Sequence, residues 1–525
     1  MRRAAQSTGW RRRAGPLHTV RVRDVNLPPA VEIPAPARLR AGARRHAIFL
    51  AVLAVGIGLR IIAQIAYWPA LLFEDSYQYL NNTEALDPGH TRPIGYPAFL
   101  ALLRLLPDLA AVPIVQHLMG LAMGVVTYTL LVRWGLWRWA AALATLPVLW
   151  DAYQVEIEHL VMSDVFFQML VLGGLALLAW RRPTIRRAAL VGALLGASVS
   201  VRLVGLPLII PAALFVLVMA EGWRRRIAAT VALSLAFAAP LVCYMAWFNY
   251  NYGEWALSDT TARVRYAGIA HFVQCEKLSS LPDYERPLCP GKPLDERLPA
   301  IGFYVWSPRS PAVQYTPPAG MEKEAVLTDF FWRVVKDQPL DFLHAVAKDF
   351  FRYFQWGKPV YPPGRSDAPW HFPEHFRAWG NARDADVAAR TYGSSGAYIN
   401  DSLADVLRAY QLSVGYTPGT LLGVALIIGL LGTLGVGRAR RSGMRAVCFL
   451  FTSAGGGLLL GASLFMFSWR YELPALVLLP VAGGLGLTAM IRGGPATPGV
   501  SSEADEDEQR GRDADRSLIT APESG

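Results

Sequence analysis

Two adjacent carboxylates, Glu74 and Asp75, directly follow the first long apolar run of this 525-residue chain. A carboxylate at the mouth of a helical bundle can act as a general base or hold a divalent cation. The alternative is a solvated loop acid, or an acid paired with a nearby arginine such as Arg60, and this is the commoner case for isolated surface acids. Tyr77 and Tyr79 follow closely and offer rings that can stack on sugars, which favours a chemical role.

A second acidic group, Glu156, Glu158 and Asp164, follows the third apolar run. Asp164 opens the next run, where ionisable residues are costly and usually functional, although an acid stabilised by the helix dipole is an equal alternative. Acids from two neighbouring loops are what a shared metal site requires, and Mg²⁺ and Mn²⁺ prefer oxygen ligands. The pattern is therefore compatible with a bound Mg²⁺ or Mn²⁺, with His159 as a polar neighbour rather than a ligand.

Three arginines, Arg60, Arg202 and Arg470, lie near ends of apolar runs on the same side as these acids. Arginines at such positions commonly extend to the bilayer surface without any specific ligand. Arg202, however, interrupts a nearly continuous apolar stretch from 188 to 220. Guanidinium groups that converge at one depth would bind the phosphate or pyrophosphate of a lipid-linked substrate, and we expect this of the three arginines.

The composition indicates what positions these residues. The chain is 53% hydrophobic and only 17% charged, with a mean hydropathy of +0.28, which is typical of an integral membrane protein. The sequence predicts an all-α polytopic membrane protein with about ten transmembrane helices. The apolar runs are 47–66, 111–132, 139–150, 161–180, 188–201, 204–220, 227–248, 418–436, 445–466 and 473–491.

Arginine clusters predict the orientation of these runs. Clusters at 133–138, 181–187, 224–226 and 438–445 alternate with loops that carry the acids. Because cytoplasmic loops are enriched in basic residues, both termini are expected in the cytoplasm and the acids on the outer face. The net charge of +11 is spread between apolar runs rather than over one folded face, which argues against nucleic-acid binding and leaves the lipid bilayer as the expected partner.

The same pattern divides the chain into five parts. A disordered basic tail (1–46) precedes a transmembrane module (47–249), whose external loop 67–110 contains an apolar helix from Tyr96 to Leu106. The segment 250–417 is too aromatic to be disordered and is expected to form an external domain of mixed structure, with helical spacing over 322–354. Three more spans (418–491) and a disordered acidic tail (492–525) complete the chain. Cys275 and Cys289 share one polar loop and are expected to form a disulfide if that loop is external.

Four short motifs carry a resemblance to a known family. In these motifs the chain resembles the polytopic GT-C glycosyltransferases, and most closely the bacterial group similar to protein O-mannosyltransferases and lipid A aminoarabinose transferases. The likeness covers about 47–250 and 440–490, and one departure is the order Glu74-Asp75 where many relatives have Asp first. The motifs are Phe73-Glu74-Asp75-Ser76-Tyr77, Arg92-Pro93-Ile94-Gly95-Tyr96-Pro97, Glu158-His159-Leu160-Val161-Met162-Ser163-Asp164 and Trp469-Arg470-Tyr471-Glu472-Leu473-Pro474.

The resemblance implies a GT-C-like bundle in the bacterial plasma membrane that uses a polyprenyl-phosphate sugar as donor. Asp75, or Glu74 if the first carboxylate is the equivalent one, would deprotonate the acceptor hydroxyl, and the lipid phosphate would leave with inversion. The acceptor would be an extracytoplasmic glycan, lipid or protein. Arginines or a divalent cation would stabilise the leaving phosphate. The expected lining of the substrate pocket is Tyr77, Arg92, Tyr96 and Tyr471.

Two other classes of function remain. A transporter or flippase of a lipid-linked substrate would place ionisable residues along a path through the bilayer, whereas the acids here crowd one face. A non-catalytic membrane protein that recruits partners through its external domain would need no grouping of Asp75 with the segment from Glu156 to Asp164.

Overall fold

The computed structural model describes residues 44–86, 88, 91–106, 108–297, 301–358, 370–374, 397–465 and 467–493. The chain divides into two compact units, Met1–Arg45 and His46–Gly525, and the described helices and strands from Ala47 onward belong to the second. The predicted tails, 1–46 and 492–525, lie almost entirely outside the described residues.

Six described helices are long and apolar enough to cross a membrane, which makes this a mostly helical, multi-pass membrane protein. They match six of the ten predicted spans. Two of the six apolar segments extend beyond a single helix, because Gly419–Arg441 includes η5 (Gly437–Arg441) and Trp469–Arg492 includes η6 (Trp469–Glu472). The six helices are α2 (Ala47–Ala66), α5 (Ala111–Arg133), α12 (Trp223–Tyr252), α20 (Gly419–Leu434), α21 (Arg445–Ser463) and α22 (Leu473–Arg492).

The other four predicted spans correspond to shorter helices. α9 and α10 have 17 residues each, so each is about 26 Å long against a hydrocarbon core of roughly 30 Å. The total of ten spans therefore stays a prediction. The shorter helices are α6 (Arg138–Leu143), α7 (Leu146–Leu149), α9 (Asp164–Trp180), α10 (Ile185–Val201), η1 (Leu203–Leu208) and α11 (Ile209–Met219).

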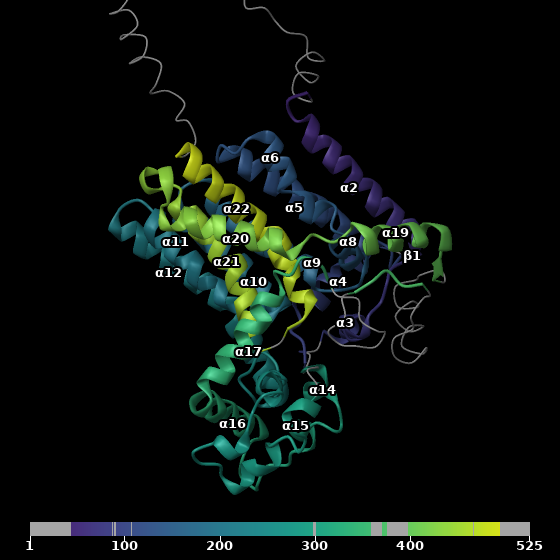
Figure 1. The fold of residues 1–525 in the computed structure, drawn as a ribbon, viewed down its shortest axis with the longest axis vertical. Helices are drawn as coiled ribbons and strands as arrows, with labels where there is room; N and C mark the ends of the chain where they lie inside the picture. The colour runs from purple at the N-terminus through teal and green to yellow at the C-terminus, as the bar shows by residue number, and fades with distance from the viewer. Residues whose placement is uncertain are drawn as a thin grey trace, which may run out of the picture. The chain divides into compact units, whose positions relative to one another are not determined.

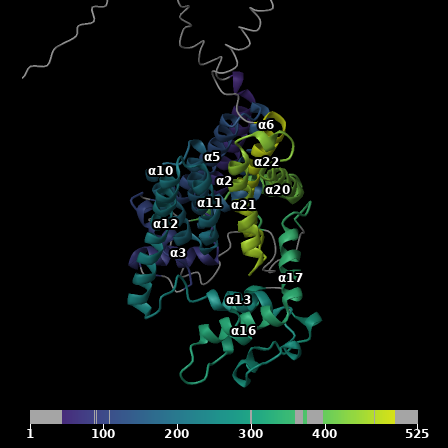
Figure 2. The same cartoon turned by 90° about the vertical axis from the view of Figure 1, so that its left-hand side faces the viewer.

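Small residues let these helices pack closely. α10 runs beside α12, and a Cβ added at Gly192 would lie 2.1 Å from the carbonyl oxygen of Leu233, which no real contact allows. Likewise, a Cβ added at Gly486 of α22 would lie 2.3 Å from the carbonyl oxygen of Ile428 on α20. Figures 1 and 2 show α20, α21 and α22 grouped together. Such close backbone contacts are common where helices associate in membranes, because packing rather than hydrophobicity holds them together.

The segment between α12 and α20 folds into short helices with a core of its own around Tyr266, Leu327 and Phe330. The predicted helical stretch 322–354 is confirmed as α16 and α17, and Cys275 and Cys289 are joined by a disulfide. Figures 1 and 2 show α13 to α16 gathered in one group. The elements are α13 (Thr261–Ala270), η2 (Cys275–Lys277), η3 (Asp283–Leu288), η4 (Leu294–Glu296), α14 (Ile301–Trp306), α15 (Pro311–Gln314), α16 (Lys323–Asp337), α17 (Pro339–Arg352), β2 (Tyr398–Ile399) and α19 (Asp401–Ser413).

The loop after α2 is fixed to the segment that precedes α9. It contains β1 (Tyr67–Trp68), α3 (Glu74–Ala85) and α4 (Gly95–Leu103), and the last of these is the predicted apolar helix of this loop. β1 pairs antiparallel with β2. Leu71 then exchanges backbone hydrogen bonds with the end of α8 (Ala152–His159), because its N–H donates to His159 and its carbonyl accepts from Val161. The start of α3 is thereby held beside the start of α9.

Candidate functional site

Asp75 lies in the first turn of α3, and a neighbouring serine fixes this turn. The Ser76 hydroxyl accepts a hydrogen bond from the Phe73 N–H (2.9 Å) and donates one to the Val161 carbonyl (2.8 Å). Asp75 is buried, with 7% of its surface exposed, whereas Glu74 is exposed. Of the two adjacent carboxylates, Asp75 is therefore the one held inside the protein.

Asp164 occupies the equivalent position in α9. It is in the first turn of that helix and only 3% exposed. The positive end of a helix dipole favours an ionised carboxylate in the first turn. Asp164 is thus a first-turn acid, as one of the two interpretations expected. It also forms ion pairs with Arg202 and Arg470.

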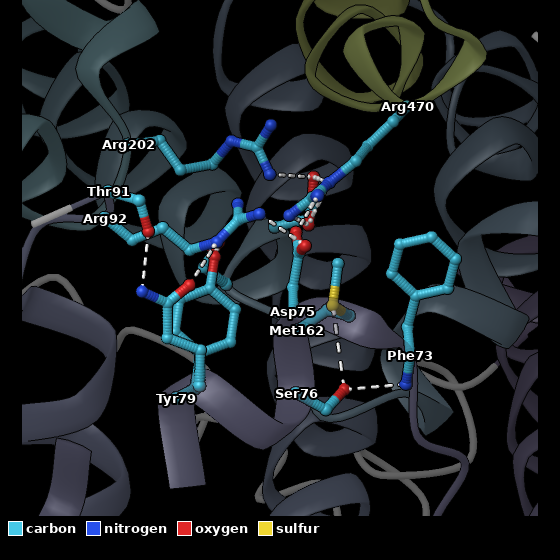
Figure 3. Close-up of polar contacts among 12 residues, drawn as sticks. Phe73, Asp75, Ser76, Tyr79, Thr91, Arg92, Met162, Arg202 and Arg470 are labelled. Atoms are coloured by element: carbon cyan, nitrogen blue, oxygen red, sulfur yellow. Dashed lines mark hydrogen bonds and ion pairs between the residues drawn. The ribbon is translucent and has the colours of Figure 1, made fainter. Parts of the chain in front are cut away.

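Three arginines and two aspartates form one continuous set of ion pairs, which we call the arginine–aspartate chain (Figure 3). Arg470 reaches both acids, with Nη1 2.6 Å from Asp75 Oδ2 and Nη2 2.8 Å from Asp164 Oδ2. Arg92 Nη2 lies 2.5 Å from Asp75 Oδ1, and Arg202 pairs with Asp164 Oδ1. The order is Arg92, Asp75, Arg470, Asp164 and Arg202. Three guanidinium groups against two carboxylates leave one net positive charge.

Aromatic rings lie against each of these arginines. The Arg92 guanidinium lies 5.7 Å from the Tyr79 ring centroid, and that of Arg202 lies 5.4 Å from the Tyr471 ring. Arg470 lies 5.8 Å from the Trp370 ring. Cation–π contacts of this kind stabilise a guanidinium without using its hydrogen-bond donors. The hydrogen-bond donors of Arg470 are therefore used by Asp75 and Asp164 and not by the rings.

The arginines determine the protonation state of Asp75. Burial alone would raise the pKa of this carboxyl, but Arg92 and Arg470 outweigh the burial and hold the pKa of Asp75 below its usual value. Asp75 is therefore ionised at neutral pH. In this arrangement it is also a weak proton acceptor, because both arginines stabilise its charged form.

The structure gives Arg60 different partners from Arg202 and Arg470. Arg60 lies within α2, and its guanidinium turns toward other helices. Its Nη1 donates to the Leu149 carbonyl (2.8 Å), and its Nη2 lies 2.7 Å from Glu158 Oε1. The sequence shows only that Arg60 is near the end of an apolar run, and the direction of its side chain depends on which helix packs against α2.

The acids expected to share a cation are also held by different partners. Glu158 accepts from Arg60 and lies 3.0 Å from His117 Nδ1, while Glu156 accepts from Gln411 Nε2 at 2.7 Å. In the described part of the chain, no group of three or more His, Cys, Asp or Glu residues is placed to hold a metal ion. The residues that we expected to bind Mg²⁺ or Mn²⁺ therefore do not form a matching donor set there.

Sequence reasoning missed His117, which joins Arg60 and Glu158 in a second network of buried charged and polar side chains. His117 lies on α5, and its Nε2 is 3.2 Å from Nδ1 of His159, whose Nε2 is 2.6 Å from the Tyr67 carbonyl oxygen. The available signal was the pair Gln116-His117 inside an otherwise apolar run. A histidine in such a run needs a buried partner, and Glu158 supplies it.

The tyrosines expected in the substrate pocket take different positions. Tyr96 is buried, donates its hydroxyl to Gln116 Oε1 at 2.9 Å, and packs edge-on against Tyr79. Tyr471 lies against Arg202, and Tyr77 is buried on α3. Tyr96 thus supports Tyr79, while Tyr471 lies beside the arginine–aspartate chain itself.

These observations define a class: a multi-pass helical membrane protein with a buried arginine–aspartate chain at the starts of α3 and α9. Comparison with protein-family models, curated proteins and solved structures finds no match for this chain. The likeness to GT-C glycosyltransferases rests on the four sequence motifs, and it stays a prediction.

Proposed function

We propose that this protein is a membrane glycosyltransferase that moves a sugar from a polyprenyl-phosphate donor to an acceptor hydroxyl. Reaction takes place at the outer face of the bacterial plasma membrane, and the acceptor is an extracytoplasmic glycan, lipid or protein. The observation that supports this proposal is the arginine–aspartate chain, which gathers three partly buried guanidinium groups from separate segments around two buried carboxylates.

A phosphate fits this chain better than a neutral ligand. Guanidinium groups bind phosphate and carboxylate oxygens with the same fork geometry, so Asp75 and Asp164 occupy positions suited to phosphate oxygens. Arg470 contacts both acids and is the central donor. The net positive charge favours an added anion, and the donor's phosphate supplies one. These arginines would also stabilise the charge that develops on the leaving phosphate.

Asp75 is the proposed general base. When the donor phosphate draws Arg92 and Arg470 toward itself, the pKa of Asp75 rises, since burial then outweighs the weakened ion pairs. Asp75 accepts the proton of the acceptor hydroxyl, and the oxygen attacks the anomeric carbon opposite the phosphate. The bond from the anomeric carbon to the phosphate oxygen breaks, and polyprenyl phosphate leaves with inversion. No step in this scheme depends on a metal ion.

The test compares two neighbouring carboxylates in proteoliposomes supplied with short-chain polyprenyl-phosphate mannose, galactose and arabinose in turn. Asp75→Asn should lower transfer to the acceptor pool by about 100-fold or more, the usual size of a lost general base. Glu74→Gln serves as the matched control and should keep nearly full activity, because Glu74 is exposed. Both variants should elute as folded protein and bind sugar-free polyprenyl phosphate.

Two results would overturn this proposal in different ways. An active Asp75→Asn enzyme would remove the base assignment while leaving the transferase activity in place. Wild-type protein that binds no polyprenyl phosphate and releases none from any donor would remove the function itself.

One observation favours a flippase as the alternative. Arg60, Glu158 and His117 form a buried ionisable network that involves two apolar helices, and transporters commonly place such groups along the substrate path. A flippase would move a fluorescent lipid-linked sugar between leaflets without releasing polyprenyl phosphate. Measuring both products in one vesicle preparation separates the two functions.

A further inference from the structure

Four buried side chains near the arginine–aspartate chain carry polar atoms with no hydrogen-bond partner among the described residues. The atoms are the Tyr153 hydroxyl, Trp469 Nε1, Lys358 Nζ and both carboxylate oxygens of Glu472. Buried polar groups nearly always find a partner, and several orphans at one place call for an explanation. We call these four residues, together with Tyr416, the polar–aromatic cluster.

The geometry of the cluster centres on Lys358. Its ammonium lies 3.1 Å from Glu472 Oε2, an ion pair without hydrogen-bond geometry, and both side chains are almost fully buried. Rings enclose the ammonium, with Tyr416 at 4.7 Å, Tyr153 at 5.2 Å and Trp469 at 5.6 Å from Nζ to the centroid. The lysine and the glutamate cancel in charge, so the cluster is neutral overall.

The cluster adjoins the arginine–aspartate chain through two connections. η6 is a 3₁₀-helix with three residues per turn, so Trp469 and Glu472 share one side while Arg470 faces another. Trp370 is the second connection. Its ring lies 5.8 Å from the Arg470 guanidinium and 6.1 Å from the Tyr153 ring. A molecule with its phosphate on Arg470 would therefore place the group attached to that phosphate within reach of the cluster.

We propose that the polar–aromatic cluster binds the neutral, hydroxylated sugar ring of the donor. This inference rests on the proposed function, because it assumes that the donor phosphate binds Arg470. Aromatic faces pack against the C–H face of a sugar. The Trp469 Nε1–H and Glu472 Oε1 lack a partner among the described residues, and the Lys358 ammonium has N–H groups beyond its ion pair with Glu472, so these atoms match hydroxyl groups.

The charges of the cluster also set its specificity. An amino sugar or a uronic acid would bring a third charge into a buried site where Lys358 and Glu472 already neutralise each other. The desolvation of that third charge would not be compensated. The cluster therefore selects uncharged sugars such as hexoses and pentoses over an aminoarabinose.

The experiment measures direct binding rather than transfer. Purified full-length protein in nanodiscs is titrated with a short-chain polyprenyl phosphate and with the same lipid carrying mannose, galactose or 4-amino-4-deoxyarabinose. Tyr153→Phe and Trp469→Phe remove one polar atom each and keep a ring. Tyr128→Phe is the control, since the Tyr128 hydroxyl pairs with His46 near the C-terminal end of α5 and belongs to neither the cluster nor the arginine–aspartate chain.

We expect at least one neutral-sugar lipid to bind more tightly than the sugar-free lipid. Each cluster variant should reduce that advantage by about fivefold to tenfold, the usual size of one lost hydrogen bond. Binding of the sugar-free lipid should stay unchanged in both variants, and the aminoarabinose lipid should show no advantage in the wild type.

The outcomes separate the two proposals. If the sugar-free lipid binds but neutral sugars add nothing, or if both variants keep the full advantage, the sugar subsite is overturned and the phosphate site stands. A preference for the amino sugar would overturn the subsite's specificity. If no phosphorylated lipid binds the wild type, the proposed function fails and the subsite falls with it.

Discussion

Arg470 holds Asp164 through two guanidinium nitrogens, with Nε 2.9 Å and Nη2 2.8 Å from Oδ2, although 306 positions separate the residues. The remaining nitrogen, Nη1, reaches Asp75. One side chain thus links the segment before α22 to the first turns of two other helices. Any ligand that moves Arg470 will alter the surroundings of both acids at once.

Arg470→Lys should abolish this double contact, because an ammonium cannot present two parallel donors to one carboxylate. We expect sugar transfer to fall by about 100-fold, in line with the loss of one well-placed donor to a developing charge. Binding of sugar-free polyprenyl phosphate should weaken as well. Arg182→Lys is a suitable control, since Arg182 makes an exposed pair with Glu221. Normal phosphate binding by Arg470→Lys would contradict the central role of Arg470.

The Arg60–Glu158 pair should matter for stability and not for phosphate binding. Arg60→Met leaves Glu158 as a buried, uncompensated charge, and such changes typically cost about 3–5 kcal/mol. The double variant Arg60→Met/Glu158→Gln should recover a large part of that loss. Thermal unfolding in detergent measures the stability, and titration with polyprenyl phosphate measures the binding. If Arg60→Met lost phosphate affinity at unchanged stability, Arg60 would have to be counted among the phosphate-binding residues.

Much of the arginine–aspartate chain could be predicted from the sequence, but its pairing could not. Asp75, Asp164, Arg202 and Arg470 stand out because each is a charge at the edge of an apolar run. Arg60 has the same local pattern yet joins a different network, since the packing of α2 against α7 and α8 decides its direction. Sequence spacing contains no information about that packing.

The polar–aromatic cluster could be predicted from the sequence even less than the arginine–aspartate chain. Lys358 lies in a polar loop, and its only local signal is that lysine occurs just six times in the chain. Its ring partners, Tyr153, Tyr416 and Trp469, come from segments far away in the sequence. The fold itself was easier to predict, because length and hydropathy define the six long helices. The two 17-residue helices lie near the minimum length for a membrane span, so the sequence does not decide whether they cross.

The disulfide between Cys275 and Cys289 should protect two thiols from labelling. In protein denatured without reductant, a maleimide should label only Cys243 and Cys448, and reduction should add two reactive thiols. Cys275→Ser/Cys289→Ser should destabilise the surrounding helices by roughly 3 kcal/mol, since the bridge closes a short loop. Protease cleavage between 261 and 337 reports the change, with Cys243→Ser as control. Full labelling before reduction would refute the bridge.

Acid should weaken the same group of helices through His271. Burial, together with Lys348 and Arg297, lowers the pKa of His271 to about 4 in the folded protein, against about 6.5 when unfolded. Between these values the unfolded chain binds a proton that the folded chain does not, so stability falls as the pH drops from 6.5 to 4. The loss should be of order 1–2 kcal/mol for this partly buried group.

Hydrogen exchange of α13 and α16 at pH 7 and pH 5 measures this effect. His271→Gln should flatten the pH dependence, because the replacement does not titrate. His344→Gln on the exposed side of α17 should leave it as it is in the wild type. Equal acid sensitivity in wild type and His271→Gln would assign the effect to another group.

The two aspartates of the arginine–aspartate chain also act as built-in competitors. Any phosphate that binds the three guanidinium groups must compete with a carboxylate that the fold holds beside them at a high effective concentration. Free inorganic phosphate is therefore expected to compete weakly with the aspartates, whereas a phosphate confined to the bilayer surface is present at a high local concentration. If the proposed donor phosphate binds here, the site would distinguish an anchored anion from a dissolved one without a separate gate.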